Sequence, residues 1–307
     1  MTASWVAGDI RARTMLEGRV GVTGARELAG SGTLAEALDR LVDGLYGREI
    51  RVGQSLAEAE RAVSTALLWR LRVLAGWQPP SGARVMRRFV GWFELSNVED
   101  RVRSMAGQLV PAPYRMGALG TAWRRLSTTG SVAELRRTLA ASTWGDPGDD
   151  TPEAIGISMR LTWANRIAEG ISDAADWARA GLALLVARER FLAGRELTEP
   201  ARRTAVGVLG AGPMRANSLT QYSGQLPAEL RWALADVSTP EELWAAENKW
   251  WTRVERDATY MLDHSRYEAA VLVAAVGLLA VDAWRVRAGL ELAAQGGTPM
   301  EAFDALA

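Results

Sequence analysis

The sequence predicts an all-α fold, because three of its patterns point to helices. Apolar residues recur every three or four positions, which is the spacing of one helix face. No stretch alternates strictly between apolar and polar residues, as a half-buried strand would. The prolines fall between the predicted helices, so these helices can run without interruption. With 307 residues, of which 48% are hydrophobic, the chain can fill a substantial core.

Two predicted helices have a clear apolar face. The first carries Leu34, Leu38, Leu41 and Leu45 on one side. The second continues its stripe over several turns through Leu272, Val276, Leu279, Ala283, Val286 and Leu290. The longest apolar run, residues 269–281, is shorter than the roughly 20 residues that a membrane-spanning helix needs. We therefore expect a buried helix there, and no direct membrane span.

Four segments share the pattern Ser/Thr-x-x-Glu, at residues 33–36, 131–134, 239–242 and 298–301. In such a capping box the hydroxyl accepts from the third amide of the helix, and the glutamate reaches back to the cap amide. The first three boxes lie about one hundred residues apart, which favours a repeated bundle over a solenoid with a period of roughly 33–47 residues. Residues 145–152 combine glycine, proline and aspartate, and they are the best candidate for a linker.

The bulk composition argues against several kinds of function. There is no cysteine, which excludes disulfides, thiol nucleophiles and thiolate metal sites. The 36 basic and 36 acidic residues cancel, so no nucleic-acid partner is expected and a polybasic membrane patch gains no support. Lys249 is the only lysine, which we interpret as codon bias toward arginine. The N-terminal residues do not form a signal peptide pattern.

The residues that usually carry catalysis do not form a recognisable set. His264 is the only histidine, and no Gly-x-Ser-x-Gly motif accompanies it. Asp146, Asp149 and Asp150 stand in a setting of glycine and proline that is typical of a solvated turn. An all-helical enzyme with paired carboxylates and a metal ion is a minor alternative. Residues 206–212 resemble a dinucleotide loop only in their glycines, because no β-α-β context surrounds them. We predict no catalytic, cofactor-binding or metal-binding residue.

The 13 tryptophans have two interpretations. Tryptophan is enriched at binding hot spots, and it is also a good core residue in helical bundles. Trp244 and Trp251 lie seven positions apart, which places them on one helix face. We expect this pair to belong to the core.

Several segments, taken in order along the chain, resemble one known family. Residues 94–98 read Glu-Leu-Ser-Asn-Val and fit the acid and the asparagine of a repeated family motif, Glu/Asp-x-x-Asn-Ile/Leu. In a later copy Asp282 fits the acid, and Arg287 fits an arginine that often follows. Residues 296–303 resemble the closing segment of the family, and residues 210–212 lie where it often has Pro-Gly-Gly. The chain thus resembles the family of central-stalk subunits of V-type and archaeal A-type ATPases, which has prokaryotic and eukaryotic members.

The resemblance implies a funnel of three pseudo-repeated helical bundles, near residues 1–110, 111–215 and 216–307. Such a subunit receives the end of a rotor axle and sits on the membrane proteolipid ring. It couples axle rotation to ion translocation, with the proton as the expected ion, and it catalyses nothing and needs no cofactor. The implied partners are the axle subunits and the proteolipid ring. The implied location is cytoplasmic, peripheral on the inner face of the cell membrane through the complex.

Equivalent polar groups of three repeats can ring an axis, so some arginines are candidates for contacts with the axle or the ring. The candidates are Arg11, Arg101, Arg179 and Arg287. Alternatively, these arginines pair within the bundles with nearby acids, which their short spacing along helices favours. The acids in question are Asp9, Glu94, Asp176 and Asp282. For the whole chain, the second hypothesis is a helical scaffold or adaptor unrelated to rotary ATPases.

Overall fold

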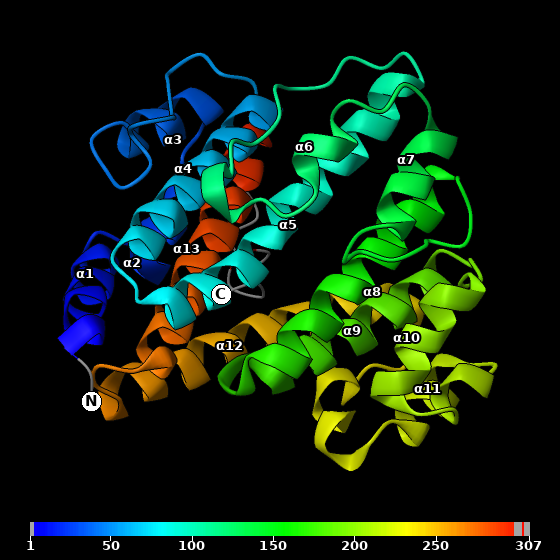
Figure 1. Cartoon of the computed structure of the whole chain (residues 1–307). Coiled ribbons are helices and arrows are strands. Elements are labelled where there is room, and N and C mark those ends of the chain that lie inside the picture. The colour runs from blue at the N-terminus through cyan, green and yellow to red at the C-terminus, as the bar shows by residue number, and fades with distance from the viewer. Residues whose placement is uncertain (1–2, 298–302, 304–307) are drawn as a thin grey trace. The chain divides into compact units, whose positions relative to one another are not determined.

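The structure is a computed structural model that describes residues 3–297 and residue 303 (Figure 1). The described chain is all-helical, with 73% helix and no strand, which confirms the predicted fold class. It forms two compact units. Unit 1 combines Met1–Ala83 with Trp251–Ala307, and unit 2 is Arg84–Trp250. The expected linker at 145–152 lies inside unit 2 and does not divide the chain, while the three-bundle boundaries stay a prediction.

The helices follow one another with short connections. Unit 1 contains η1 (Ala3–Trp5), α1 (Val6–Glu17), α2 (Gly21–Ala29), α3 (Leu34–Leu41), α4 (Leu56–Gly76) and α13 (Ala269–Ala294). The unit boundaries fall inside α5 (Pro80–Met105) and α12 (Leu243–His264). Unit 2 contains η2 (Gly117–Leu119), α6 (Trp123–Leu126), α7 (Val132–Ala140), α8 (Pro152–Gly170), η3 (Ser172–Ala174), α9 (Ala175–Ala187), the π-helical turn η4 (Arg188–Leu192), α10 (Glu199–Leu209), η5 (Pro213–Arg215), α11 (Leu219–Gln225), η6 (Ala228–Leu234) and η7 (Pro240–Glu242).

Helix α13 is the central helix of unit 1. It packs along α2 and α4 and also contacts α1 and α3 (Figure 1). Its residues Ala283, Val286 and Leu290 share one core with Leu38 and Leu41 of α3, so both predicted apolar faces are confirmed. By length and composition α13 could cross a membrane, but 78% of its most apolar window is buried inside the structure. The prediction of a buried helix is confirmed.

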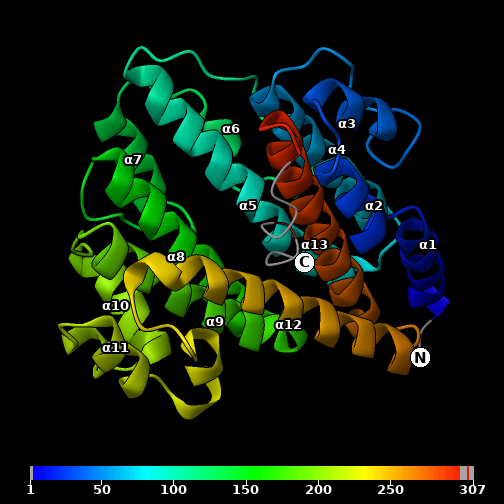
Figure 2. The ribbon, with the colours of Figure 1, turned by 180° about the vertical axis from the view of Figure 1, so that it is seen from behind.

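Helix α8 separates two cores in unit 2. Ile155 and Met159 pack with residues of α5, α6 and α7. Ile157 and Leu161 pack with α9, α10, α11 and η6, and the start of α12 joins that second core. Figure 2 shows α8 and α9 side by side, in agreement with their close packing. Because the hydrophobic residues of α8 lie on opposite sides, α8 shows little of the one-sided pattern of a surface helix.

The predicted capping residues begin helices where the structure describes them. Thr33 and Ser131 accept the N–H of the glutamate three residues later, both at 3.2 Å. At η7 the carboxylate of Glu242 accepts the N–H of Thr239 at 3.1 Å. The fourth predicted box, at 298–301, lies outside the described residues. Ser55 with Glu58 forms a further capping box with the same pattern, at a position that was not among the four predicted.

The expectation that Trp244 and Trp251 both belong to the core is wrong for Trp244. Its side chain is 53% exposed, because the buried side of this part of α12 is set by Leu243 and Ala246. Trp251 is half-buried, and its ring stacks on Trp284 with 5.5 Å between centroids. A spacing of seven places two residues on one face, but it does not say whether that face is covered.

Two glycines inside helices predict opposite effects of one substitution. A Cβ on Gly289 of α13 would lie 2.9 Å from the carbonyl oxygen of Ala25, so Gly289→Ala must push α2 away. We expect it to lower the free energy of unfolding by about 1–3 kcal/mol. Nothing lies within 4 Å of a Cβ on Gly207 of α10, so Gly207→Ala should raise it by about 0.5–1 kcal/mol. Denaturant unfolding followed by circular dichroism measures both, and a stabilising Gly289→Ala would contradict the close packing of α13 on α2.

Candidate functional site

A buried carboxylate in unit 2 holds the start of a short helix. Glu94 lies on α5 and is fully buried. Its carboxylate accepts the N–H of Thr121 at 2.9 Å, the hydroxyl of Thr121, and the N–H of Ala122. These groups stand directly before α6, where amides have no partner within the helix. A negative charge at this end is also favoured by the helix dipole. Glu94 thus fixes α6 to α5.

A second buried carboxylate does the same in unit 1. Asp282 of α13 is 2% exposed and accepts the N–H of Gly21, at the start of α2, at 2.7 Å. It also accepts the N–H of Val20 at 3.3 Å and the hydroxyl of Tyr46 at 2.9 Å. Burial, followed by the charge of Asp282, raises the pKa of Tyr46 well above its usual range. The phenol therefore stays protonated and remains a donor.

The asparagine of the family-like motif has a role next to Glu94. One turn later on α5, the side chain of Asn97 donates to the carbonyl of Tyr114 at 3.0 Å and accepts its N–H at 2.7 Å. Glu94 and Asn97 together fasten the segment that connects α5 to α6. On α13 the corresponding position after Asp282 is Arg285, whose guanidinium binds both oxygens of Glu255 at 2.6 and 2.7 Å. The motif acid keeps its role in both places, whereas the residue three positions later does not.

The four candidate arginines have different surroundings. Arg101 donates to the carbonyl of Thr129, just before α7. Arg179 is exposed and lies 3.5 Å from Asp176. Arg11 and Arg287 are half-buried, and the Nε of each is buried without a hydrogen-bond partner. Arg11 and Arg287 belong to unit 1, and Arg101 and Arg179 belong to unit 2.

The alternative that these arginines pair with the neighbouring acids is correct for only one pair. Asp176 contacts Arg179, as expected. Asp9 instead binds Arg13, at 2.5 Å, because that residue lies one full turn further along α1. Glu94 and Asp282 are occupied by helix N-termini, which supply amide donors inside the core.

Arg190 makes the contact that we expected of Arg179. It lies on the π-helical turn η4 and donates to the carbonyls of Pro213 at 3.1 Å and Ala216 at 2.8 Å, just before the capped helix α11. Arg101 reaches the carbonyl that stands at the same distance ahead of the cap of α7. Both arginines precede their serine cap by a similar number of residues, and this spacing could have identified Arg190 from the sequence.

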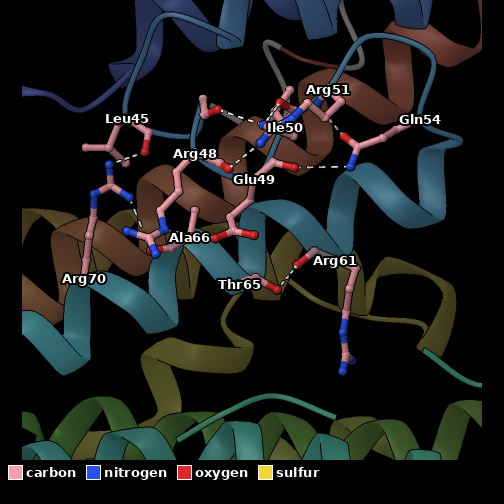
Figure 3. Close-up of polar contacts among 11 residues, drawn as sticks. Leu45, Arg48, Glu49, Ile50, Arg51, Gln54, Arg61, Thr65, Ala66 and Arg70 are labelled. Carbon is pink, nitrogen blue, oxygen red and sulfur yellow. Dashed lines mark hydrogen bonds and ion pairs between the residues drawn. The ribbon is translucent and has the colours of Figure 1, made fainter. Parts of the chain in front are cut away.

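Arginines also organise the segment that follows α3. Figure 3 shows Arg51 donating to the carbonyls of Gly47 at 3.0 Å and Ile50 at 2.6 Å, and it also reaches the carbonyl of Arg48 at 3.1 Å. Arg70 of α4 donates to the carbonyl of Leu45. These carbonyls lie beyond the end of a helix and lack helical partners. The guanidinium groups supply the missing donors, so this arginine cluster is built to hold a loop.

The largest cavity described in unit 2 has a volume of about 480 Å³ and mixed charge. Its walls include the carboxylates of Asp149, Glu153 and Glu196, and the pair of Glu189 with Arg195 at 2.8 Å. Among the described residues, no group of three or more histidines or carboxylates is placed to hold a metal ion. The side chains of Asp146 and Asp149 accept backbone N–H groups in the turn before α8, as a solvated turn requires.

Comparison with known proteins adds no family. No protein-family model matches the chain, and no curated protein matches it. A function for this chain must therefore be argued from its own residues and contacts.

We expect Glu94→Gln to destabilise the chain by about 2–4 kcal/mol, the range for a buried hydrogen-bonded charge that loses its partners. Glutamine has one acceptor oxygen, and its NH₂ group would face an N–H donor of Thr121 or Ala122. Glu58→Gln is the control, because Glu58 caps α4 at the surface. Thermal and denaturant unfolding measure both variants. Equal, small effects would show that the buried carboxylate does not hold α6.

Arg51→Ala should loosen one loop without unfolding its unit. Three carbonyls lose their donor, so amide hydrogen exchange in residues 46–54 should become at least about tenfold faster, which corresponds to about 1.4 kcal/mol of lost local stability. The melting temperature should change little. Arg40→Ala serves as the control, because Arg40 is exposed and lies 3.8 Å from Glu27. The same increase in both variants would contradict the role given to Arg51.

Proposed function

We propose that this chain is a non-catalytic central-stalk, or rotor, subunit of a V/A-type ATPase. It would couple the rotating axle to the membrane proteolipid ring for ion translocation, with the proton as the expected ion. The observation that carries the proposal is the recurrence of one polar arrangement at three places along the chain, together with the family-like motif at residues 94–98.

Three capped helices share an unusual extra hydrogen bond. The N–H of the residue before the cap is bound by the side chain three residues after the cap. This bond joins Gly32 to Glu36 at 3.0 Å, Gly130 to Glu134 at 2.7 Å and Asn217 to Gln221 at 2.9 Å. In chain order, each capped helix is followed by a long one, α4, α8 or α12. This recurrence supports three pseudo-repeated bundles, which we propose form the funnel of the family.

The long helices α5, α9 and α13 carry further traces of repetition. A buried acid that holds a helix start occurs on α5 as Glu94 and on α13 as Asp282. An arginine that holds the segment before a capped helix occurs on α5 as Arg101 and just after α9 as Arg190. Each feature is present in two of three sets, which is the pattern that divergence from one duplicated unit produces.

The contacts also suit a part that transmits torque. Such a part must keep its shape under load, and buried charged groups with several hydrogen bonds resist local opening. It needs no catalytic residue, since ATP hydrolysis and ion transfer take place elsewhere in the motor. In this proposal the partners are the axle subunits and the proteolipid ring, and the chain is cytoplasmic and peripheral on the inner membrane face through its complex. A helical scaffold or adaptor unrelated to rotary ATPases is the alternative.

Purification of the tagged chain from gently solubilised host membranes tests the proposal. We expect axle subunits and the ring proteolipid in a fixed ratio, identified by mass spectrometry. Arg287→Gln should lower their recovery, because the half-buried Nε of Arg287 has no partner within the chain. Arg202→Gln on exposed α10 is the matched control. A chain that stays in the cytosol and recovers neither partner would favour the scaffold.

A further inference from the structure

Charge is distributed unevenly along this chain, although its formal sum is zero. Residues 101–145 contain seven arginines and a single acid, Glu134. This stretch comprises the end of α5, the connection to α6, and the helices α6 and α7. The balanced total therefore conceals a strongly basic part of unit 2.

Only some of these arginines are used inside the fold. Arg101 binds the carbonyl of Thr129, Arg103 pairs with Asp100, and Arg136 pairs with Asp146. The remaining four are exposed, and within the described part of the chain their guanidinium groups form no hydrogen bond or ion pair. They are Arg115, Arg124, Arg125 and Arg137. We call these four residues the basic surface.

The basic surface lies on the outside of one core. α6 and α7 turn Leu126, Leu135 and Leu139 inward, so their arginines remain on the solvent side. In the connection between α5 and η2, the side chain of Leu109 is as exposed as in an extended chain, with a relative exposure of 103%. Gly107 lies just before it with φ +80°, where side chains are rarely tolerated. A large apolar side chain is thus presented in a stretch rich in unpaired arginines.

We propose that the basic surface, together with Leu109, docks on the headgroups of an anionic membrane. Guanidinium groups bind phosphate oxygens through paired hydrogen bonds, and unpaired arginines lose no internal partner when they do so. Leu109 can enter the apolar boundary beneath the headgroups, where its exposure to water ends. Neither of the two cavities described in unit 2 is lined by Leu109 or any residue of the basic surface. An open surface suits a sheet of headgroups better than an acidic peptide, which needs a groove.

This inference does not depend on the rotor assignment, because lipid vesicles contain no motor protein. The test is co-sedimentation of the purified full chain with vesicles of phosphatidylcholine alone or mixed with phosphatidylglycerol. We expect binding only to the anionic vesicles, and weaker binding at high salt. Arg124→Glu with Arg125→Glu should weaken it at least about 25-fold, at roughly fivefold per arginine. Leu109→Ser should weaken it as well.

Two controls carry the same chemical changes elsewhere in unit 2. Arg202→Glu with Arg203→Glu reverses two exposed, adjacent arginines of α10 that both contact Glu199. Leu192→Ser removes a leucine that is 48% exposed. Both should bind anionic vesicles as the unchanged chain does. No binding of the unchanged chain, equal binding to neutral vesicles, or equal loss in the two double variants would each overturn the proposal. Capture of polyglutamate in place of vesicles would also overturn it and would indicate an acidic protein partner.

Discussion

The structure depends on buried carboxylates that reach from long helices to the starts of short ones. α6 spans only Trp123–Leu126, far fewer than the roughly 12–15 residues that make an isolated helix even marginal in water. Its two leading N–H groups are bound by Glu94, and its Leu126 then joins the core that α7 completes. Without that anchor, the donors of Thr121 and Ala122 would be left without partners close to an apolar core, which is unfavourable. Asp282 has the same relation to α2.

This construction explains how a chain with many short helices can behave as a stiff body. Arginines supply donors to carbonyls that follow or precede helices, as Arg51, Arg70 and Arg190 do. Serine, threonine and glutamate supply acceptors at helix starts. Most of the connecting segments are thus fastened to a helix by side-chain hydrogen bonds. A passive coupling element of a rotary motor would need this property, and a binding scaffold could use it as well.

Local patterns made part of this predictable. The apolar faces and the serine and threonine caps act within a few residues, so the sequence revealed them. The acid and asparagine at residues 94–98 were visible, but their partners lie 17–28 residues away and depend on the path of a loop. Arg190 escaped notice because a π-helical turn displaces it, and Ser218 because its partner is glutamine rather than glutamate. The basic surface was hidden by a net charge averaged over the whole chain.

Amide hydrogen exchange on the unchanged chain tests the central role of the carboxylates most directly. Amides in the first turn of a helix normally exchange fast, because they lack helical partners. Those of Gly21, Thr121 and Ala122 should instead exchange only when their unit unfolds, as slowly as amides in the middle of α13 or α5. Fast exchange at these three amides, at the rate of Leu34 at the start of α3, would contradict the account.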